Sequence, residues 1–287
     1  MDPKFRIAAI TDEYSPSNLK AALEAMQATG MTGAELRVIW NKNIMDLSDD
    51  ELDRARDLCI RHGMEVISIA SPLLKCILPD APAVDPRFQQ DTFNAKHTIA
   101  DQPRLLERAV KIAGKMDAKI IRVFSYWRST EPEKCFDAVV KAVSEMADQV
   151  KSHGLIIGLE NEHACNIATA TESARALAAI PNENVKLVWD PANCLCSGED
   201  PFPFGYRLLP KDRIVHVHAK DCHMEGHKPI WGPLGTRSVD WKGQIAALIA
   251  DGYKGWLSLE THWPGPGGDK MEASKICGWN LRGLAAA

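Results

Sequence analysis

Short apolar runs alternate with longer amphipathic stretches along the whole chain. The short runs have the length of buried strands, whereas the longer stretches repeat their apolar positions with the period of a helix. Strands are predicted at residues 6–10, 33–39, 65–70, 119–125, 155–160, 185–190, 213–218 and 256–260. Helices are predicted at 17–29, 48–62, 102–116, 133–153, 171–179, a short piece near Tyr206, 241–251 and 270–284.

Eight strands that each precede a helix-like stretch predict parallel pairing through right-handed crossovers. This is the pattern of a closed (β/α)8 TIM barrel, here a single domain over residues 1–287. The alternative is an open doubly wound sheet, but no Gly-rich dinucleotide or phosphate loop follows any strand. Residues 71–100 break the rhythm and contain prolines, so they are predicted to form a lid insertion over the barrel mouth.

Four consecutive predicted strands in the second half of the chain end on a side chain that can bind a metal: Glu160, Asp190, His218 and Glu260. The carboxyl ends of parallel barrel strands converge on one mouth. Three carboxylates and one imidazole suit a hard or borderline divalent cation. A single carboxylate in such a place can equally cap a helix or pair with arginine. Four potential metal ligands at successive strand ends, about one strand–helix unit apart, predict a metal site.

Two histidines and a lysine alternate near the end of the seventh predicted strand. His216 and His218 are two residues apart, so both should point to the same face. His218 is nearer the mouth and is the expected ligand, with His216 below it as a hydrogen-bonding partner; the reverse assignment stays open. Lys220 continues the alternation and is expected to donate to a substrate oxygen, although a solvated loop lysine is the other reading.

Further polar and aromatic residues are expected around a substrate. Glu35 and Arg37 alternate within the second predicted strand, so both should face the barrel interior. Arg122 lies inside the fourth strand, where a buried guanidinium needs a carboxylate such as Glu35; an internal ion pair and a substrate contact both satisfy this. The complete set of expected substrate-binding residues is Glu35, Trp40, Arg122, His163, Asn193, His216 and Lys220.

Composition points to a small-molecule partner. The net charge of -4 and pI of about 6.1 give no general attraction to nucleic acid or anionic membranes. The chain contains no apolar stretch of membrane-spanning length, and its amino terminus lacks the basic and apolar regions of a secretion signal, which predicts a cytoplasmic protein. Association into a homo-oligomer is expected, with the number of subunits undefined.

Several segments resemble the xylose isomerase-like barrel superfamily. They are GLENEH, WDPANCL, VHVHAKD, GYKGWLSLETH, and PLG at 233–235 followed by VDW at 239–241. That superfamily holds sugar and sugar-phosphate isomerases and epimerases, inosose dehydratases, hydroxypyruvate isomerases and family 2 apurinic endonucleases. The resemblance implies that Glu160, Asp190, His218 and Glu260 match the single-metal set of keto-sugar epimerases. Manganese usually fills that set, and cobalt, magnesium or zinc are alternatives.

The resemblance implies a metal-dependent isomerase or epimerase acting on a keto-sugar or related polyol. Proton removal next to a carbonyl gives an enediolate that needs a cation on its oxygen. Glu160 and Glu260 are the expected catalytic pair, one removing the proton and the other returning it. A dehydratase or lyase acting on an inosose or a 3-keto-glycoside is the alternative, and a non-catalytic sugar-binding barrel is a further one.

Two departures separate the chain from the endonuclease branch of the superfamily. Asn193 stands where the epimerases and endonucleases often carry a histidine. The third and fourth strands also end without the histidines that bind further zinc ions in the endonucleases. A three-zinc cluster and DNA cleavage are therefore not expected. In the loops after the seventh and eighth predicted strands, the candidate basic residues for binding a phosphate are Lys220, His223, Lys228 and Arg237, and these do not form a phosphate signature, so an unphosphorylated substrate is preferred.

Overall fold

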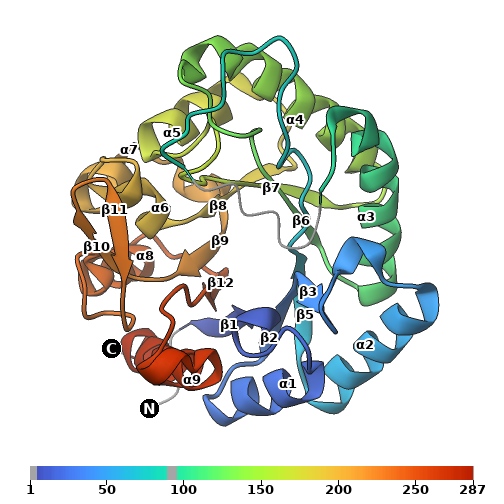
Figure 1. The fold of residues 1–287 in the computed structure, drawn as a ribbon, viewed down its shortest axis with the longest axis vertical. Helices are drawn as coiled ribbons and strands as arrows, with labels where there is room; N and C mark the ends of the chain where they lie inside the picture. The colour runs from blue at the N-terminus through green and yellow to red at the C-terminus, as the bar shows by residue number, and fades with distance from the viewer. Residues whose placement is uncertain (1–4, 89–95, 287) are drawn as a thin grey trace.

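Eight parallel strands close into a barrel in the computed structural model, which describes residues 5–88 and 96–286 (Figure 1). Every neighbouring pair in this barrel is parallel. The predicted (β/α)8 barrel and its single domain are therefore confirmed. The strands, in order around the barrel, are β1 (Arg6–Ile10), β2 (Gly33–Leu36), β5 (Glu65–Ile69), β6 (Ile120–Val123), β7 (Ile156–Glu160), β8 (Val185–Trp189), β9 (Ile214–Ala219) and β12 (Trp256–Leu259).

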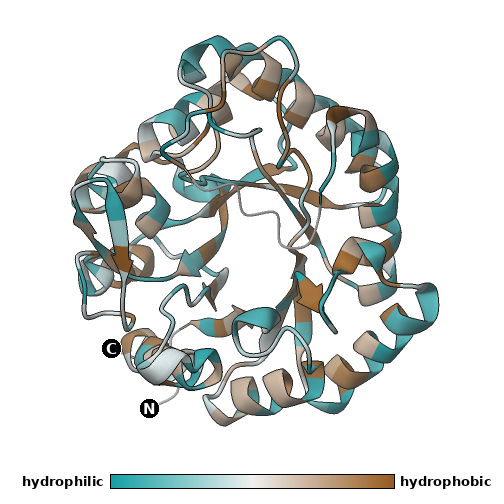
Figure 2. Ribbon diagram, in the orientation of Figure 1, coloured by the Kyte–Doolittle hydropathy of each residue, from teal (hydrophilic) through white to brown (hydrophobic). Residues whose placement is uncertain are grey.

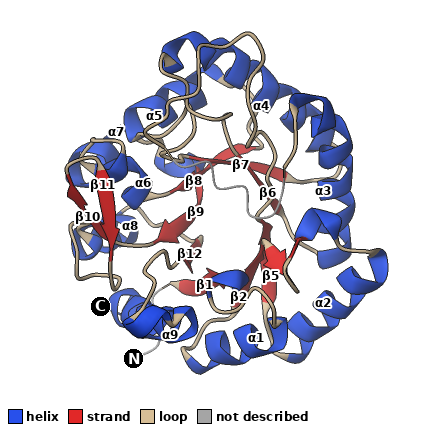
Figure 3. Cartoon of the chain, in the orientation of Figure 1, coloured by secondary structure: helices blue, strands red, loops and turns tan. Residues whose placement is uncertain are grey.

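Helices form a ring outside the strands (Figure 3). The long ones are α1 (Leu19–Ala28), α2 (Asp49–Arg61), α3 (Gln102–Met116), α4 (Phe136–Lys151), α5 (Ala170–Ala179), α8 (Trp241–Ala250) and α9 (Lys270–Ala286); α6 (Pro191–Cys196) and α7 (Tyr206–Leu208) are short. Single turns of helix lie at Thr11–Glu13, Ile44–Asp46, Ile99–Asp101, Pro132–Cys135, Pro201–Gly205, Lys211–Arg213 and Pro266–Gly268.

The capping patterns in the sequence begin two of these helices. The Ser48 hydroxyl accepts from the Glu51 amide at 3.2 Å, and the Glu51 carboxylate accepts from the Ser48 amide at 2.8 Å. Thr169 and Glu172 form the same reciprocal pair before α5. Each pair satisfies amide groups that the first helical turn leaves without a partner, which defines where the helix starts.

The main apolar core lies between the strands and the helices. Each long helix carries both hydrophobic and hydrophilic residues, and α3 buries Leu105, Ala109 and Ile112 (Figure 2). Burying one such leucine or isoleucine stabilises the fold by about 1.5–3 kcal/mol. Inside the barrel, a separate small cluster of Ala8, Ile67 and Trp256 is apolar. Trp256 is at the first position of β12, so this cluster closes the amino-terminal end of the barrel.

Two hairpins depart from the predicted elements. The predicted strand 33–39 ends as a barrel strand at Leu36, and β3 (Val38–Ile39) then pairs antiparallel with β4 (Lys42–Asn43). Trp40 and Asn41 form the turn, with φ angles of 52° and 60°. A second hairpin, β10 (Cys222–Glu225) with β11 (Lys228–Trp231), lies between β9 and α8, where no strand was predicted.

The predicted lid is described in part. Residues 71–88 follow β5 and hydrogen-bond to the segment after β6: the amides of Phe124, Tyr126 and Trp127 donate to carbonyls of the predicted lid at 2.8–3.0 Å. Residues 89–95 lie outside the described residues, so the lid over the mouth stays a prediction. Among the helices of the described residues, none has both the length and the apolar character needed to cross a membrane.

Candidate metal centre

The four predicted metal ligands lie together at the carboxyl end of the barrel. Glu160 is the last residue of β7, Asp190 follows β8, His218 is near the end of β9, and Glu260 follows β12. One ligand atom from each residue lies within 4.8 Å of the others, and all four residues are buried. The strand alternation points each side chain into the barrel, so adjacent strands bring together residues that are about one strand–helix unit apart in sequence.

One nitrogen of His218 faces the three carboxylates. Its Nδ1 lies 3.1 Å from Glu160 Oε1, 3.6 Å from Glu260 Oε2 and 4.0 Å from Asp190 Oδ2. His216 lies deeper and its Nε2 contacts Glu35 instead. Of the two histidines that the sequence left open, the structure therefore places His218 within reach of the carboxylates.

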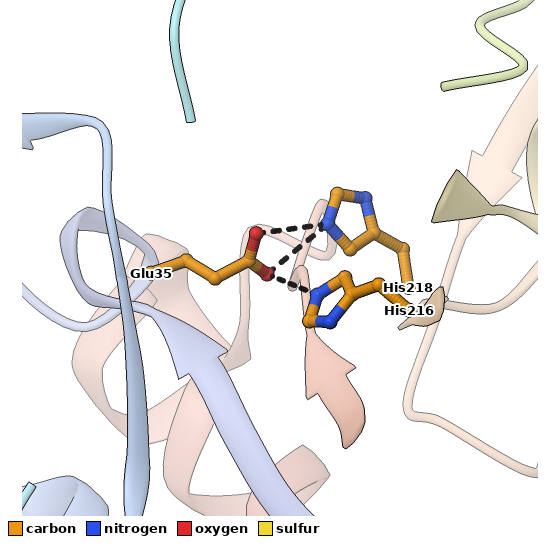
Figure 4. A group of neighbouring side chains, drawn as sticks. All are labelled: Glu35, His216 and His218. Carbon is orange, nitrogen blue, oxygen red and sulfur yellow. Dashed lines mark hydrogen bonds and ion pairs between the residues drawn. The ribbon is translucent and has the colours of Figure 1, made fainter. Parts of the chain in front are cut away.

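Glu35 lies next to the Nε2 atoms of the two imidazole rings (Figure 4). Its Oε1 is 2.8 Å from His216 Nε2 and 3.1 Å from His218 Nε2, and it accepts from the Ser258 hydroxyl. A carboxylate on one ring nitrogen orients a histidine and leaves its other nitrogen for a metal. Glu35 is completely buried against the rings and positions them, and its expected contact with substrate stays a prediction.

Two cationic side chains pair with Asp190 and Glu260. Lys220 Nζ lies 2.9 Å from Asp190 Oδ2 and 2.7 Å from Glu260 Oε2. Arg37 Nη1 lies 2.8 Å from Glu260 Oε1. Each charge is buried and would be costly without its partner, so these contacts hold the carboxylates in place.

Arg122 pairs with Glu160 and not with Glu35. Its Nη1 lies 3.2 Å from Glu160 Oε2, and its Nη2 donates to the carbonyls of Ala70 and Ser71. The sequence-based partner was wrong because β6, which carries Arg122, lies beside β7, whose last residue is Glu160. The Glu35 carboxylate is meanwhile engaged by the two histidines.

The neighbouring charges shift the pKa values in the cluster. Burial by itself would raise the pKa of Glu260, but Lys220 and His262 lower it well below its usual range. Burial raises the pKa of Asp190, against the opposing effect of Lys220. Burial would lower the pKa of His218, but Glu35 and Glu160 raise it well above its usual value. The cluster therefore holds strongly coupled charges in a space that excludes water.

The donor atoms fit a divalent cation. Asp190 Oδ1 accepts from the Asn193 amide at 2.9 Å and so caps α6, which leaves Oδ2 for another partner. Asp190 Oδ2 and Glu160 Oε2 are fully buried and accept no hydrogen bond from the described part of the chain, although each lies at ion-pair distance from a cationic side chain. Carboxylate oxygens and an imidazole nitrogen suit manganese, zinc, cobalt or magnesium.

A cavity of about 410 Å³ borders the cluster. Its lining includes Glu162 and His163 from the loop after β7, Trp231 from β11, and His262 after β12. His262 Nε2 lies 3.6 Å from Glu260 Oε1, and Lys220 Nζ lies 5.7 Å from the centre of a Trp231 ring. The cavity lining therefore approaches Glu260 through His262 and Lys220 through Trp231. Arg37 and Trp231 were not among the predicted site residues; the inward alternation of Arg37 with Glu35 was the available signal.

The remaining predicted residues take different places. His163 lines the cavity, and its Nδ1 lies 2.8 Å from Asn193 Oδ1. Asn193 is completely buried behind that ring and supports His163, and its expected contact with substrate stays a prediction. Trp40 lies in a separate hollow beside α1 and α2, with the Arg54 guanidinium 4.7 Å from the centre of its ring. Trp40 is therefore absent from the lining of the cavity of about 410 Å³, and its expected contact with substrate stays a prediction.

Comparisons with known proteins agree with this geometry. A family model described as a xylose isomerase-like TIM barrel matches residues 23–277. An inosose dehydratase of Lacticaseibacillus casei is 24% identical over 170 residues, which are 54% of this chain and 55% of that protein. The rhizopine catabolism protein MocC of Rhizobium meliloti is 26% identical over 167 residues, 53% of this chain and 50% of that protein. The chain therefore matches only about half the length of these curated relatives.

Solved structures share the whole fold. The IOLI protein, solved with a bound zinc atom, has a TM-score of 0.74 at 16% identity and covers 98% of both chains. The 3-keto-D-glucoside 4-epimerase YcjR from E. coli has a TM-score of 0.69 at 15% identity, covering 96% of this chain and 99% of the other. At such identities the likeness shows the fold.

Proposed function

Because the chain belongs to the xylose isomerase-like TIM barrel family, we propose that it is a divalent-metal-dependent enzyme that removes a proton next to the carbonyl of a keto-sugar or related polyol. The single observation that carries this proposal is the convergence of Glu160, Asp190, His218 and Glu260 within 4.8 Å of one another. The adjoining cavity of about 410 Å³ lies within the range of about 300–1,000 Å³ for small-molecule sites.

These four residues would hold the metal ion, proposed to be manganese with cobalt, magnesium and zinc as alternatives. A bound divalent cation supplies a Lewis acid that polarises a carbonyl oxygen. The chain's own contribution is to orient the ligands: Glu35 holds His218 through Nε2 at 3.1 Å, and Asp190 is fixed by the amino end of α6. Lys220, at 2.7 Å from Glu260, brings a further positive charge to the site where negative charge develops on the substrate.

Glu160 and Glu260 are the proposed proton-transfer residues. They lie at the ends of β7 and β12, which are separated around the barrel by β8 and β9, so they approach a bound sugar from two directions. Arg122 holds one oxygen of Glu160, and Arg37 holds one oxygen of Glu260. One carboxylate can take the proton and the other can return it to the opposite face, which is epimerisation, or to a neighbouring carbon, which is isomerisation.

Elimination is the second candidate function. Several sequence relatives are named inosose dehydratase, from Lacticaseibacillus, Geobacillus and Salmonella among others. Loss of a hydroxyl or a glycosidic oxygen from the carbon beyond the enediolate uses the same first proton transfer. An inosose or a 3-keto-glycoside is the proposed substrate class for this reaction.

The first test compares wild type with Glu260→Gln. Bound metal is measured by elemental analysis, and solvent deuterium uptake is followed by NMR across a panel of keto-sugars in D2O. We expect wild type to bind a single metal ion per chain and to exchange the proton next to the carbonyl, and the variant to lose exchange. Glu24→Gln, an exposed carboxylate on α1, is the control and should behave as wild type. Absence of both metal and exchange in wild type would overturn the proposal.

A further inference from the structure

His163 is held by one edge of its ring. Its Nδ1 lies 2.8 Å from Asn193 Oδ1 and 3.0 Å from Glu162 Oε1. The Asn193 amide nitrogen donates to the Asn161 carbonyl at 3.0 Å, so its oxygen is the atom that faces the imidazole. A carboxylate and an amide oxygen can only accept here, so Nδ1 carries a hydrogen. Nε2 is therefore the nitrogen left for a further partner.

The His163 side chain borders the cavity. His163 is one of the cavity-lining residues, and its side chain is 19% exposed. Within the described ranges, no side chain or carbonyl hydrogen-bonds to Nε2. The same cavity is bordered by Trp231 and His262, which lie next to Lys220 and Glu260. A ligand that fills the cavity would thus contact His163 together with Trp231 and His262, the cavity residues that lie nearest to Lys220 and Glu260.

The surroundings of the ring favour its protonated form. Burial by itself would lower the pKa of His163, but Glu162 raises it above its ordinary value, and Lys220 only partly opposes this effect. A carboxylate and an amide oxygen at Nδ1 leave Nε2 as the nitrogen available to a ligand in the cavity that His163 lines, and this arrangement is suited to general acid–base catalysis. Epimerisation does not require such a group, because the proton removed from the substrate is replaced on carbon and no oxygen leaves. Elimination requires a general acid, because the departing oxygen must be protonated.

We infer that His163 donates a proton from Nε2 to the oxygen that leaves the carbon β to the carbonyl, so that the site carries out elimination. This inference rests on the proposed function. A carboxylate, Glu160 or Glu260, takes the proton from the carbon α to the carbonyl. The electron pair of that C–H bond forms a C=C bond, and the β C–O bond breaks with its pair. The oxygen takes the His163 proton and departs as water or an alcohol, leaving an α,β-unsaturated ketone.

The test varies the leaving group. Wild type and His163→Ala are given the methyl and the 4-nitrophenyl glycosides of 3-keto-glucose. Methoxide must be protonated as it leaves, whereas nitrophenolate leaves without help. We expect methanol release by the variant to fall about 100-fold or more, the usual contribution of a general acid. Nitrophenolate release should fall by less than about tenfold, and deuterium exchange at the α carbon should continue at nearly the wild-type rate.

Two further variants separate catalysis from folding. Glu162→Gln keeps a hydrogen-bonding group beside His163 but removes its charge, so it should show the same leaving-group pattern with a smaller loss. His153→Ala changes an exposed histidine just after α4 and should match wild type. The ¹⁵N NMR signals of the His163 ring provide a readout independent of turnover: Nδ1 should carry a hydrogen in both protonation states of the ring, and Nε2 should carry one in the form that donates.

The outcomes distinguish the two proposals. No deuterium exchange in wild type would overturn the proposed function and this inference with it. Exchange in wild type, with both glycosides losing activity equally in His163→Ala, would overturn the inference alone, because a structural defect does not depend on the leaving group. The inference alone would also be overturned if His163→Ala released methanol at the wild-type rate. It would likewise be overturned if the wild type only inverted the centre and released no alcohol.

Discussion

The Arg37 guanidinium lies 2.8 Å from Glu260 Oε1 and links the residue after β2 to the residue after β12. The same side chain also pairs with Asp12 and Glu13. Arg37→Met would leave three buried carboxylates without this partner. We expect a loss of about 3–5 kcal/mol in the free energy of unfolding, measured with urea. Lys134→Met is the control: its exposed pair with Glu131, at 2.7 Å, should contribute about 0–1 kcal/mol. Equal losses in the two variants would contradict this reading.

Asp190 and Asp240 provide a matched pair for the metal site. Both cap a helix by accepting from the amide three residues on, at 2.9 Å in each case, but only Asp190 lies in the carboxylate cluster. Asparagine caps a helix about as well as aspartate. We therefore expect Asp190→Asn to fold normally and lose its metal, and Asp240→Asn to retain it, as measured by elemental analysis and circular dichroism. Retention of the metal by both variants would remove Asp190 from the ligand set.

Glu35→Gln tests whether the carboxylate beneath the histidines supports metal binding. Its Oε1 is 3.1 Å from His218 Nε2, and loss of such a partner typically lowers metal affinity by about 10–100-fold. Isothermal titration with Mn²⁺ should show that decrease. Glu65→Gln, on the neighbouring strand but exposed, should leave the affinity unchanged. An unaltered affinity in Glu35→Gln would mean that His218 keeps its orientation without this contact.

Trp231 and Trp40 should differ in their effect on substrate binding. Trp231 lines the cavity, with its ring centre 4.6 Å from that of His262, whereas Trp40 packs with Arg54 on the outside of the barrel. We expect Trp231→Ala to raise KM several-fold for 4-nitrophenyl 3-keto-glucoside, because it removes an aromatic wall, while Trp40→Ala leaves KM unchanged. A higher KM in Trp40→Ala alone would restore the substrate role that the sequence indicated.

The His163 pKa has a consequence for stability. Burial would lower this pKa, but Glu162 and the hydrogen bond that Nδ1 donates to Asn193 Oδ1 raise it, with Lys220 opposing them. A pKa raised on folding contributes stability below the unfolded value, and that stability is lost as the pH rises through the folded value. The advantage of wild type over His163→Asn in urea unfolding should therefore be larger near pH ~6 than near pH ~9. A constant difference between the two proteins would show that the ring does not gain a proton on folding.

Hydrophobic period and spacing were enough to predict the barrel. The eight strand-like runs all became barrel strands, because a short apolar run between amphipathic helices has few other ways to bury both its faces. The same regularity placed Glu160, Asp190, His218 and Glu260 at one end, since parallel strands of similar length end at the same level. Their proximity thus followed from local patterns, while their roles stay predictions for the experiments above.

Contacts across the barrel were decided only by the tertiary structure. Arg122 pairs with Glu160 because β6 and β7 are neighbours. Glu35 contacts His216 and His218, which are 181 and 183 residues away in the sequence. Trp40 has a positive φ angle, in the left-handed region of backbone conformation, which a tryptophan in the sequence does not predict. Strand alternation determines which face a side chain takes, but its partner depends on strand neighbours and loop paths, and these exist only once the barrel has closed.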